Sequence, residues 1–162
     1  ALKDGVAMFH ADHGNLAGTG AAISVQTVSA GRLAMRKMKA GDGQRVVTMN
    51  APTIILAGPE QETAIDKFLA TIAPTATDDV NIFSGRLTKV ITEAITGKEW
   101  FLTVGPTKRT HNFKHGYLRD RTAPRVRLDE PFGTQGVRMT LEHDFGAGAV
   151  NYRGGYKNPG QA

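Results

Sequence analysis

Residues 52–59, with the sequence PTIILAGP, form the segment that most constrains how this chain can fold. Its three consecutive large aliphatic residues include two β-branched isoleucines, and the run is too short for a helix and too apolar for a strand with one solvated face. Proline has no N–H to donate to a β-ladder and restricts the residue before it, so a proline at each end limits the strand. The segment is therefore predicted to be a buried central strand.

Helical patterns flank this strand on both sides. Before it, residues 27–39 carry apolar side chains on one helical face, and Thr27 or Ser29 is the expected N-cap. After it, residues 60–73 carry apolar side chains at spacings i, i+3, i+4 and i+7, namely Ile65, Phe68, Leu69 and Ile72. A strand that connects to helices on both sides usually lies in a sheet which those helices cover. The predicted fold class is α+β, with a mixed sheet and two or more flanking helices.

The C-terminal half is predicted to add antiparallel strands. Residues 87–96 alternate in polarity, and Gly97 and Lys98 are expected to turn the chain into residues 99–104, which gives a β-hairpin. Further strands are expected at 117–121, 125–128, 137–145 and 149–153. Residues 156–162 carry no periodic signal and are predicted to be a flexible tail. A length of 162 residues predicts a single domain over residues 1–162.

The excess positive charge lies in one segment. Residues 108–127 hold seven of the 20 basic residues but only one of the 15 acidic residues, and the basic ones are Lys108, Arg109, Lys114, Arg119, Arg121, Arg125 and Arg127. Arginine suits carboxylates at protein interfaces as well as phosphates, so the segment is a candidate for inter-subunit or DNA-facing contacts. Two aromatic residues among the charges leave single-stranded nucleic acid as an alternative partner, and a solvated surface as another.

No enzymatic motif is present. The three serines lack the Gly-x-Ser-x-Gly elbow, the glycine runs lack the pattern of a P-loop or of a dinucleotide site, and no cysteine is available as a nucleophile or metal ligand. His10, Asp12 and His13 form the most metal-like cluster, but no third strong ligand motif lies nearby. Their side chains are expected to hold a loop through hydrogen bonds. We therefore expect no catalytic residue, no metal and no cofactor.

The order of the sequence blocks resembles one family. The segments DGVAMFHADHGNLA at 4–17, AMRK at 34–37, the strand at 52–59, GYL at 116–118, APRV at 123–126 and DFGAGAVNYRGGYKNPG at 144–160 are similar to those of Mu-like major head subunits of tailed bacteriophages. The first and last blocks are the specific ones. Together the blocks span nearly the whole chain in the order of that family.

The resemblance implies a major capsid protein of the Hong Kong ninety-seven fold. The matching part is the C-terminal, axial-domain-like portion, because no candidate for the long spine helix or the extended loop precedes Thr27. The implied partners are other copies of the chain, packaged DNA and a prohead protease, which in some relatives is fused upstream. The implied location is the virion, after assembly in the cytoplasm of the bacterial host. No apolar run is long enough to suggest a membrane span. A free-standing basic nucleic-acid-binding module is the alternative function.

Overall fold

A computed structural model describes residues 2–40, 43–44, 46, 50–70, 81–106, 110, 112–133 and 135–161. The chain divides into two compact units: unit 1 comprises residues 1–112 and 150–162, and unit 2 comprises residues 113–149. The prediction that residues 1–162 form one domain stays a prediction.

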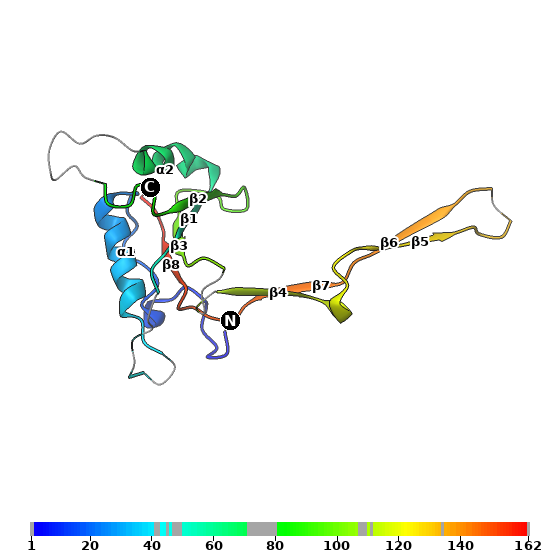
Figure 1. Cartoon of the computed structure of the whole chain (residues 1–162), viewed down its shortest axis with the longest axis horizontal. Coiled ribbons are helices and arrows are strands. Elements are labelled where there is room, and N and C mark those ends of the chain that lie inside the picture. Colours follow the sequence, from blue (N-terminus) through cyan, green and yellow to red (C-terminus); the bar gives the residue numbers. More distant parts are fainter. Residues whose placement is uncertain are drawn as a thin grey trace. The chain divides into compact units, whose positions relative to one another are not determined.

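Unit 1 contains a four-stranded mixed sheet (Figure 1). Its strands are β1 (Ile54–Ala57), β2 (Thr88–Ile91), β3 (Trp100–Thr103) and β8 (Gly155–Asn158), and they lie in the order β2-β1-β3-β8. β1 is an interior strand that pairs in parallel with β2 and antiparallel with β3. The predicted central strand and the α+β class with a mixed sheet are thus confirmed.

Two helices pack on one face of this sheet, α1 (Val25–Lys37) and α2 (Glu62–Leu69) (Figure 1). The register aligns Ile55 with Leu102 and Leu102 with Tyr156, so these three side chains share one face of the sheet. They join the buried residues of both helices, Val28, Met35 and Ile65, in a single apolar core. The burial of this face supplies most of the hydrophobic stabilisation of unit 1.

The first helix begins earlier than the sequence pattern predicts. Ser24 is its N-cap: the Ser24 hydroxyl accepts from the Thr27 N–H at 3.2 Å, and the Thr27 hydroxyl accepts from the Ser24 N–H at 2.9 Å. The expectation of a cap at Thr27 or Ser29 is therefore wrong, because Thr27 serves as the second member of a capping box. A short 3-10 turn, η2 (Pro59–Gln61), leads into α2.

The predicted hairpin between residues 87–96 and 99–104 is wrong. β2 and β3 flank β1 on opposite sides and do not pair with each other. After β2 the chain crosses the end of β1, where the Thr92 N–H donates to the Ala57 carbonyl at 3.1 Å and a Cβ at Gly58 would lie 2.1 Å from the Ile95 carbonyl oxygen. A glycine at position 58 permits this close crossing.

The predicted flexible tail at residues 156–162 is wrong for the segment that forms β8. Tyr156 and Asn158 are buried, with 7% and 3% of their surface exposed, and β8 pairs antiparallel with β3. Asn158 also accepts the Ala21 N–H at 2.9 Å, which attaches the chain before α1 to this edge of the sheet. These long-range contacts order the strand. They produce no periodic pattern in the local sequence, which is why the strand was not predicted.

The N-terminal segment contacts the other face of the sheet and pairs with its edge at β8. The ring of Phe9 lies 5.3 Å from that of Phe101 on β3, Leu16 forms a parallel bridge with Lys157, and residues Ala11–His13 form a 3-10 turn, η1.

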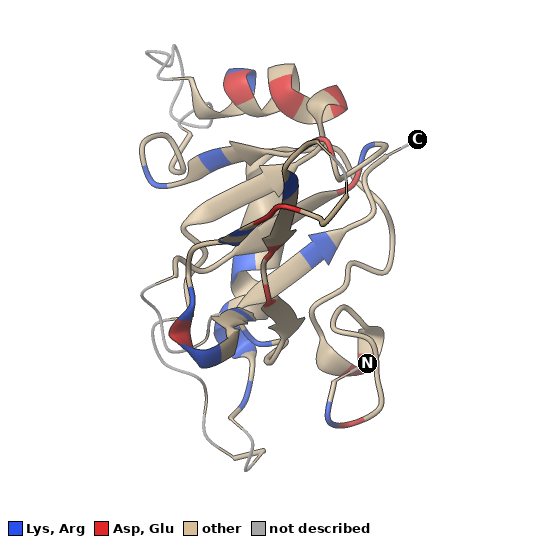
Figure 2. Cartoon of the chain, turned by 90° about the vertical axis from the view of Figure 1, so that its right-hand side faces the viewer, with Lys and Arg blue, Asp and Glu red and all other residues tan. Residues whose placement is uncertain are grey.

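Acidic positions lie on α2 (Figure 2), and Glu62 and Asp66 of this helix both contact Lys89 of β2, at 3.1 and 2.7 Å. These ion pairs connect α2 to the strand at the edge of the sheet.

Unit 2 consists of two antiparallel ladders along one excursion of the chain. β4 (Phe113–Tyr117) pairs with β7 (Phe145–Ala149), and β5 (Arg125–Asp129) pairs with β6 (Arg138–Glu142). A 3-10 turn, η4 (Leu118–Asp120), follows β4. The expected strand at 137–145 is divided into β6 and the start of β7. The strands expected at 117–121 and 149–153 are not formed as such, because the pairing begins at Phe113 and ends at Ala149.

Candidate assembly surface

The β5–β6 ladder has one entirely apolar face. Val126 lies opposite Leu141, and Leu128 lies opposite Met139. Successive side chains on a strand point to opposite faces, so these four share one face. Their exposed fractions are 54%, 66%, 70% and 69% respectively. We call the β5–β6 ladder the ribbon, and these four residues the apolar face of the ribbon.

The opposite face of the same ladder is charged and pairs internally. Arg125 lies opposite Glu142, and Asp129 lies opposite Arg138. A diagonal ion pair joins Arg127 Nη2 to Glu142 Oε2 at 3.6 Å. Opposite charges across a ladder favour this register, while their exposure keeps the energy of each pair small.

The β4–β7 ladder also has two different faces. One bears Phe113, His115 and Tyr117, and Phe145 lies across the ladder from Tyr117. The other bears Lys114 and the glycines Gly116, Gly146 and Gly148. None of these glycines has a positive φ, and a Cβ on each would meet no atom within 4 Å. Nothing within the described part of the chain therefore requires glycine at these positions.

Three rings gather at the end of the β4–β7 ladder, next to the junction with the β5–β6 ladder. His143 lies between Tyr117 and Phe145, with ring centroids 5.7 and 5.5 Å away. Seven residues, 118–124, connect β4 to β5, whereas only two residues, 143–144, connect β6 to β7. This difference in length interrupts the pairing between the two ladders. Arg119 and Asp120 have φ of 55° and 57°, the left-handed conformation that is uncommon for residues other than glycine. Arg119 and Asp120 thus bend the longer of the two connecting segments, residues 118–124.

The basic residues singled out in the sequence are distributed over unit 2. Lys114 is on β4, Arg119 is in η4, Arg125 and Arg127 are on β5, and Arg121 lies with Arg125, Glu142 and Asp144 around a small hollow. Lys108 and Arg109 lie outside the described residues. Residues 113–149 hold six basic and five acidic residues, so the acids of the returning strand nearly balance the charge that the sequence segment 108–127 shows alone.

His10, Asp12 and His13 are held in a hydrogen-bonded turn. The Asp12 N–H donates to His10 Nδ1 at 3.2 Å, and the ring of His13 stacks on Tyr152 with centroids 3.9 Å apart. His13 Nε2 lies 2.8 Å from Asp4 Oδ2. A hydrogen bond from the Val6 N–H, together with His13, lowers the pKa of the Asp4 carboxyl. Within the described residues, no group of three or more potential ligands could hold a metal ion.

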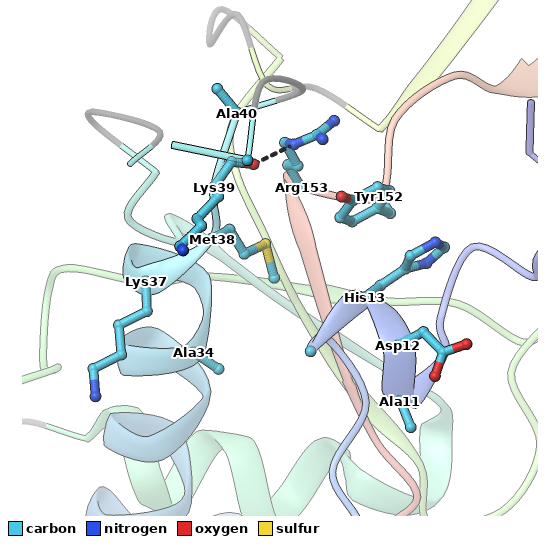
Figure 3. Close-up of a pocket in the computed structure, with 12 residues that line it drawn as sticks. Ala11, Asp12, His13, Ala34, Lys37, Met38, Lys39, Ala40, Tyr152 and Arg153 are labelled. Atoms are coloured by element: carbon cyan, nitrogen blue, oxygen red, sulfur yellow. Dashed lines mark hydrogen bonds between the residues drawn. The ribbon is translucent and has the colours of Figure 1, made fainter. Parts of the chain in front are cut away.

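A cavity of ≈ 570 Å³ lies beside this turn, between η1 and the C-terminal end of α1. Its cations do not converge on one point: the amino group of Lys37 points away from His13, and Arg153 Nε donates to the Lys39 carbonyl at 2.6 Å (Figure 3). The guanidinium of Arg153 also lies 4.4 Å from the ring of Tyr152. Among the described residues that line this cavity, the cations are therefore not arranged around a common anion site.

The sequence did not reveal the apolar face of the ribbon as a surface. Alternation within residues 125–128 and 137–145 predicted strands, but which residues lie opposite each other depends on the connecting turn. The alternation did contain the signal, because the apolar residues in both segments occur at every second position. Of the described helices, none is long and apolar enough to cross a membrane.

A family model described as a phage capsid protein matches residues 1–158. The chain is also similar to the crystal structure of a phage-related protein from Bordetella bronchiseptica RB50, with a TM-score of 0.59 and 11% sequence identity. That similarity covers 94% of this chain but 57% of the other, so the chain spans little more than half the length of its structural neighbour. No curated protein matches the chain.

Proposed function

Because the chain belongs to the phage capsid protein family, we propose that it is a structural subunit of an icosahedral tailed-phage or prophage head. In this proposal the subunits assemble through capsomer contacts and enclose DNA. The observation that carries the proposal is the match to the family model over residues 1–158. The blocks at 4–17 and 144–160 further support a Mu-like major head subunit of the Hong Kong ninety-seven fold.

A shell subunit acts by burying the same surfaces against its neighbours at every symmetry-related position. Its functional residues are contacts and not catalysts. Unit 1, with two helices on one face of a mixed sheet, suits the axial-domain-like part of such a subunit. Unit 2 supplies ladders whose side chains are mostly exposed in a single chain and are therefore open to contacts with other molecules.

The basic residues are proposed to take part in these contacts. Lys114, Arg119, Arg121, Arg125 and Arg127 would meet carboxylates of a neighbouring subunit or phosphates of packaged DNA, as would Lys108 and Arg109. The partners in this proposal are other copies of the chain, DNA and a fused or separate prohead protease. The location is the virion, with assembly in the host cytoplasm.

Negative-stain electron microscopy of the full-length gene product, expressed in bacteria, tests the proposal. Closed shells of uniform size are the expected result. Dispersed small particles, under conditions in which the fluorescence of the buried Trp100 shows native folding, would contradict it. Binding of DNA by those particles with a steep salt dependence would then indicate the nucleic-acid-binding alternative.

A further inference from the structure

The apolar face of the ribbon is a surface without a partner in the single chain. Val126, Leu128, Met139 and Leu141 are adjacent across one ladder, and each is more than half exposed. A two-stranded ribbon is marginally stable in water unless its apolar face packs against something. A cluster of this kind is typical of an interaction site, whereas single exposed apolar residues are common on any protein.

The charges of the ribbon indicate what kind of partner the face accepts. The arginines of β5 and β6 lie on the opposite face, where Glu142 and Asp129 lie across from them. The apolar face itself carries no cation that could meet a phosphate. Nucleic acid therefore does not suit this face, and an apolar protein surface does.

A second copy of the chain provides such a surface in the ribbon itself. In unit 1 the exposed large apolar residues that the structure describes are scattered over α1, β2 and several loops: Val25, Leu33, Val46, Ile82, Val90 and Val150. The ribbon, which belongs to unit 2, instead gathers four exposed large apolar residues on one face. Two such faces would meet without like charges opposing each other, because every charge of the β5–β6 ladder is on the outer side.

We propose that the apolar face of the ribbon packs against the same face of a second copy of this chain. The pair is related by a two-fold axis and forms two layers of two strands each, with Val126, Leu128, Met139 and Leu141 of both copies between the layers. This inference rests on the proposed function, since it assigns one of the contacts by which shell subunits would associate.

The absence of cysteine from the chain permits a direct test by cross-linking. Single cysteines are introduced at Leu128 or Met139 on the apolar face, and at Thr140 on the opposite face as a matched control. The purified 162-residue chain is treated at low concentration with a short bismaleimide that spans roughly the 10 Å between packed sheets. We expect Leu128→Cys and Met139→Cys to give at least about tenfold more covalent dimer than Thr140→Cys.

Equal cross-linking at Met139→Cys and Thr140→Cys, or no cross-linking at any position, overturns the inference. A second measurement uses Leu128→Glu, with native Trp100 fluorescence as the control for folding of unit 1, and is expected to remove the dimer in solution. The two proposals fail differently. Wild-type and Leu128→Glu proteins that both form normal shells contradict the ribbon pairing alone, whereas a cross-linked dimer that never forms shells contradicts the proposed function alone.

Discussion

Gly31 of α1 lies directly against Tyr156 of β8. A Cβ at position 31 would lie 2.8 Å from Cδ1 of the tyrosine ring and 2.9 Å from Cδ1 of Leu102. Both distances are well below ordinary van der Waals contact, so the absence of a side chain lets the helix approach the sheet. Residues more than a hundred positions apart in the sequence thereby determine how closely the two layers of unit 1 pack.

Gly31→Ala is expected to destabilise the protein. Alanine is favoured in a helix over glycine by about 1 kcal/mol, but overpacking of a core costs about 1–3 kcal/mol, and the rings and methyl groups around position 31 are themselves buried. Urea unfolding followed by the fluorescence of Trp100 measures the difference. Gly136→Ala is the control, because its Cβ would meet no atom within 4 Å and its stability should change by less than about 0.5 kcal/mol. A Gly31→Ala protein more stable than wild type would contradict the close packing of α1.

Asn50→Ala is expected to lower the free energy of unfolding by about 2 kcal/mol or more. The buried Asn50 side chain donates from Nδ2 to the Met35 carbonyl at 2.8 Å and to the Arg153 carbonyl at 2.6 Å. It thus joins the end of α1 to the chain before β8. Thermal unfolding by circular dichroism measures the change, with the exposed Gln26→Ala on α1 as control. Asn50→Asp should be at least as destabilising, because a carboxylate cannot donate to either carbonyl; a neutral result for it would contradict the assignment.

Lys89→Met is expected to affect stability in a pH-dependent way. Hydrogen bonds that the Lys89 ammonium donates to the carboxylates of Asp66 and Glu62 raise its pKa above the ordinary value of 10.5. A raised pKa in the folded state means that the stabilisation is fully present below the ordinary value and is lost as the pH rises through the folded value. The difference in unfolding free energy between wild type and variant should therefore be constant near neutral pH and shrink above about pH 10.5. A difference that grows with alkalinity would exclude the ion pairs as its source.

Replacement of residues 113–149 by a short Gly-Ser turn is expected to leave unit 1 folded. The Asn112 carbonyl accepts the Val150 N–H at 2.8 Å, so the two ends of the excision are already adjacent. Closure of a short loop there costs little chain entropy. Trp100 fluorescence and the urea midpoint should stay close to those of the intact chain. Loss of the native emission would instead mean that unit 1 depends on unit 2.

Simultaneous Arg119→Glu, Arg121→Glu and Arg125→Glu changes are expected to abolish shell assembly or genome packaging. Arg125 lies opposite Glu142, so part of the effect would come from like charges across the ladder. The same triple variant with Arg125→Gln in place of Arg125→Glu puts no like charge opposite Glu142 and so separates the two causes. Electron microscopy of particles and measurement of their DNA content give the result. Normal shells with normal DNA in the triple variant would exclude a role for these arginines.

Local sequence patterns predicted the helices and the central strand, because short-range forces determine these elements. The run at 54–57 identified β1, and the 3.6-residue spacing identified α1 and α2. The parallel partner of β1 could not be found in this way, because a parallel pair has no turn that marks it and a hairpin was the simpler interpretation of residues 87–104. The sequence pattern likewise assigned Tyr156 to a flexible tail. Its burial could not be predicted locally, because it depends on the space that the distant Gly31 leaves.

The candidate surface was predictable only in part. The basic residues were visible in the sequence, but the neutralisation of Arg125 and Arg127 by Glu142 depends on the register of β5 with β6. The same register places Val126 beside Leu141 and so creates the apolar face. A pairing shifted by one residue would have sent the apolar side chains of one strand to the charged face.

The insertion of unit 2 between β3 and β8 has a consequence during synthesis on the ribosome. β8 follows the whole of unit 2 along the chain, yet it pairs with β3, which precedes it. The four-stranded sheet therefore cannot be completed until residues 113–149 have been translated and β8 has emerged from the ribosome. A nascent chain would therefore expose its ribbon before β8 completes the core, and the proposed pairing of two ribbons could begin between neighbouring chains on one messenger.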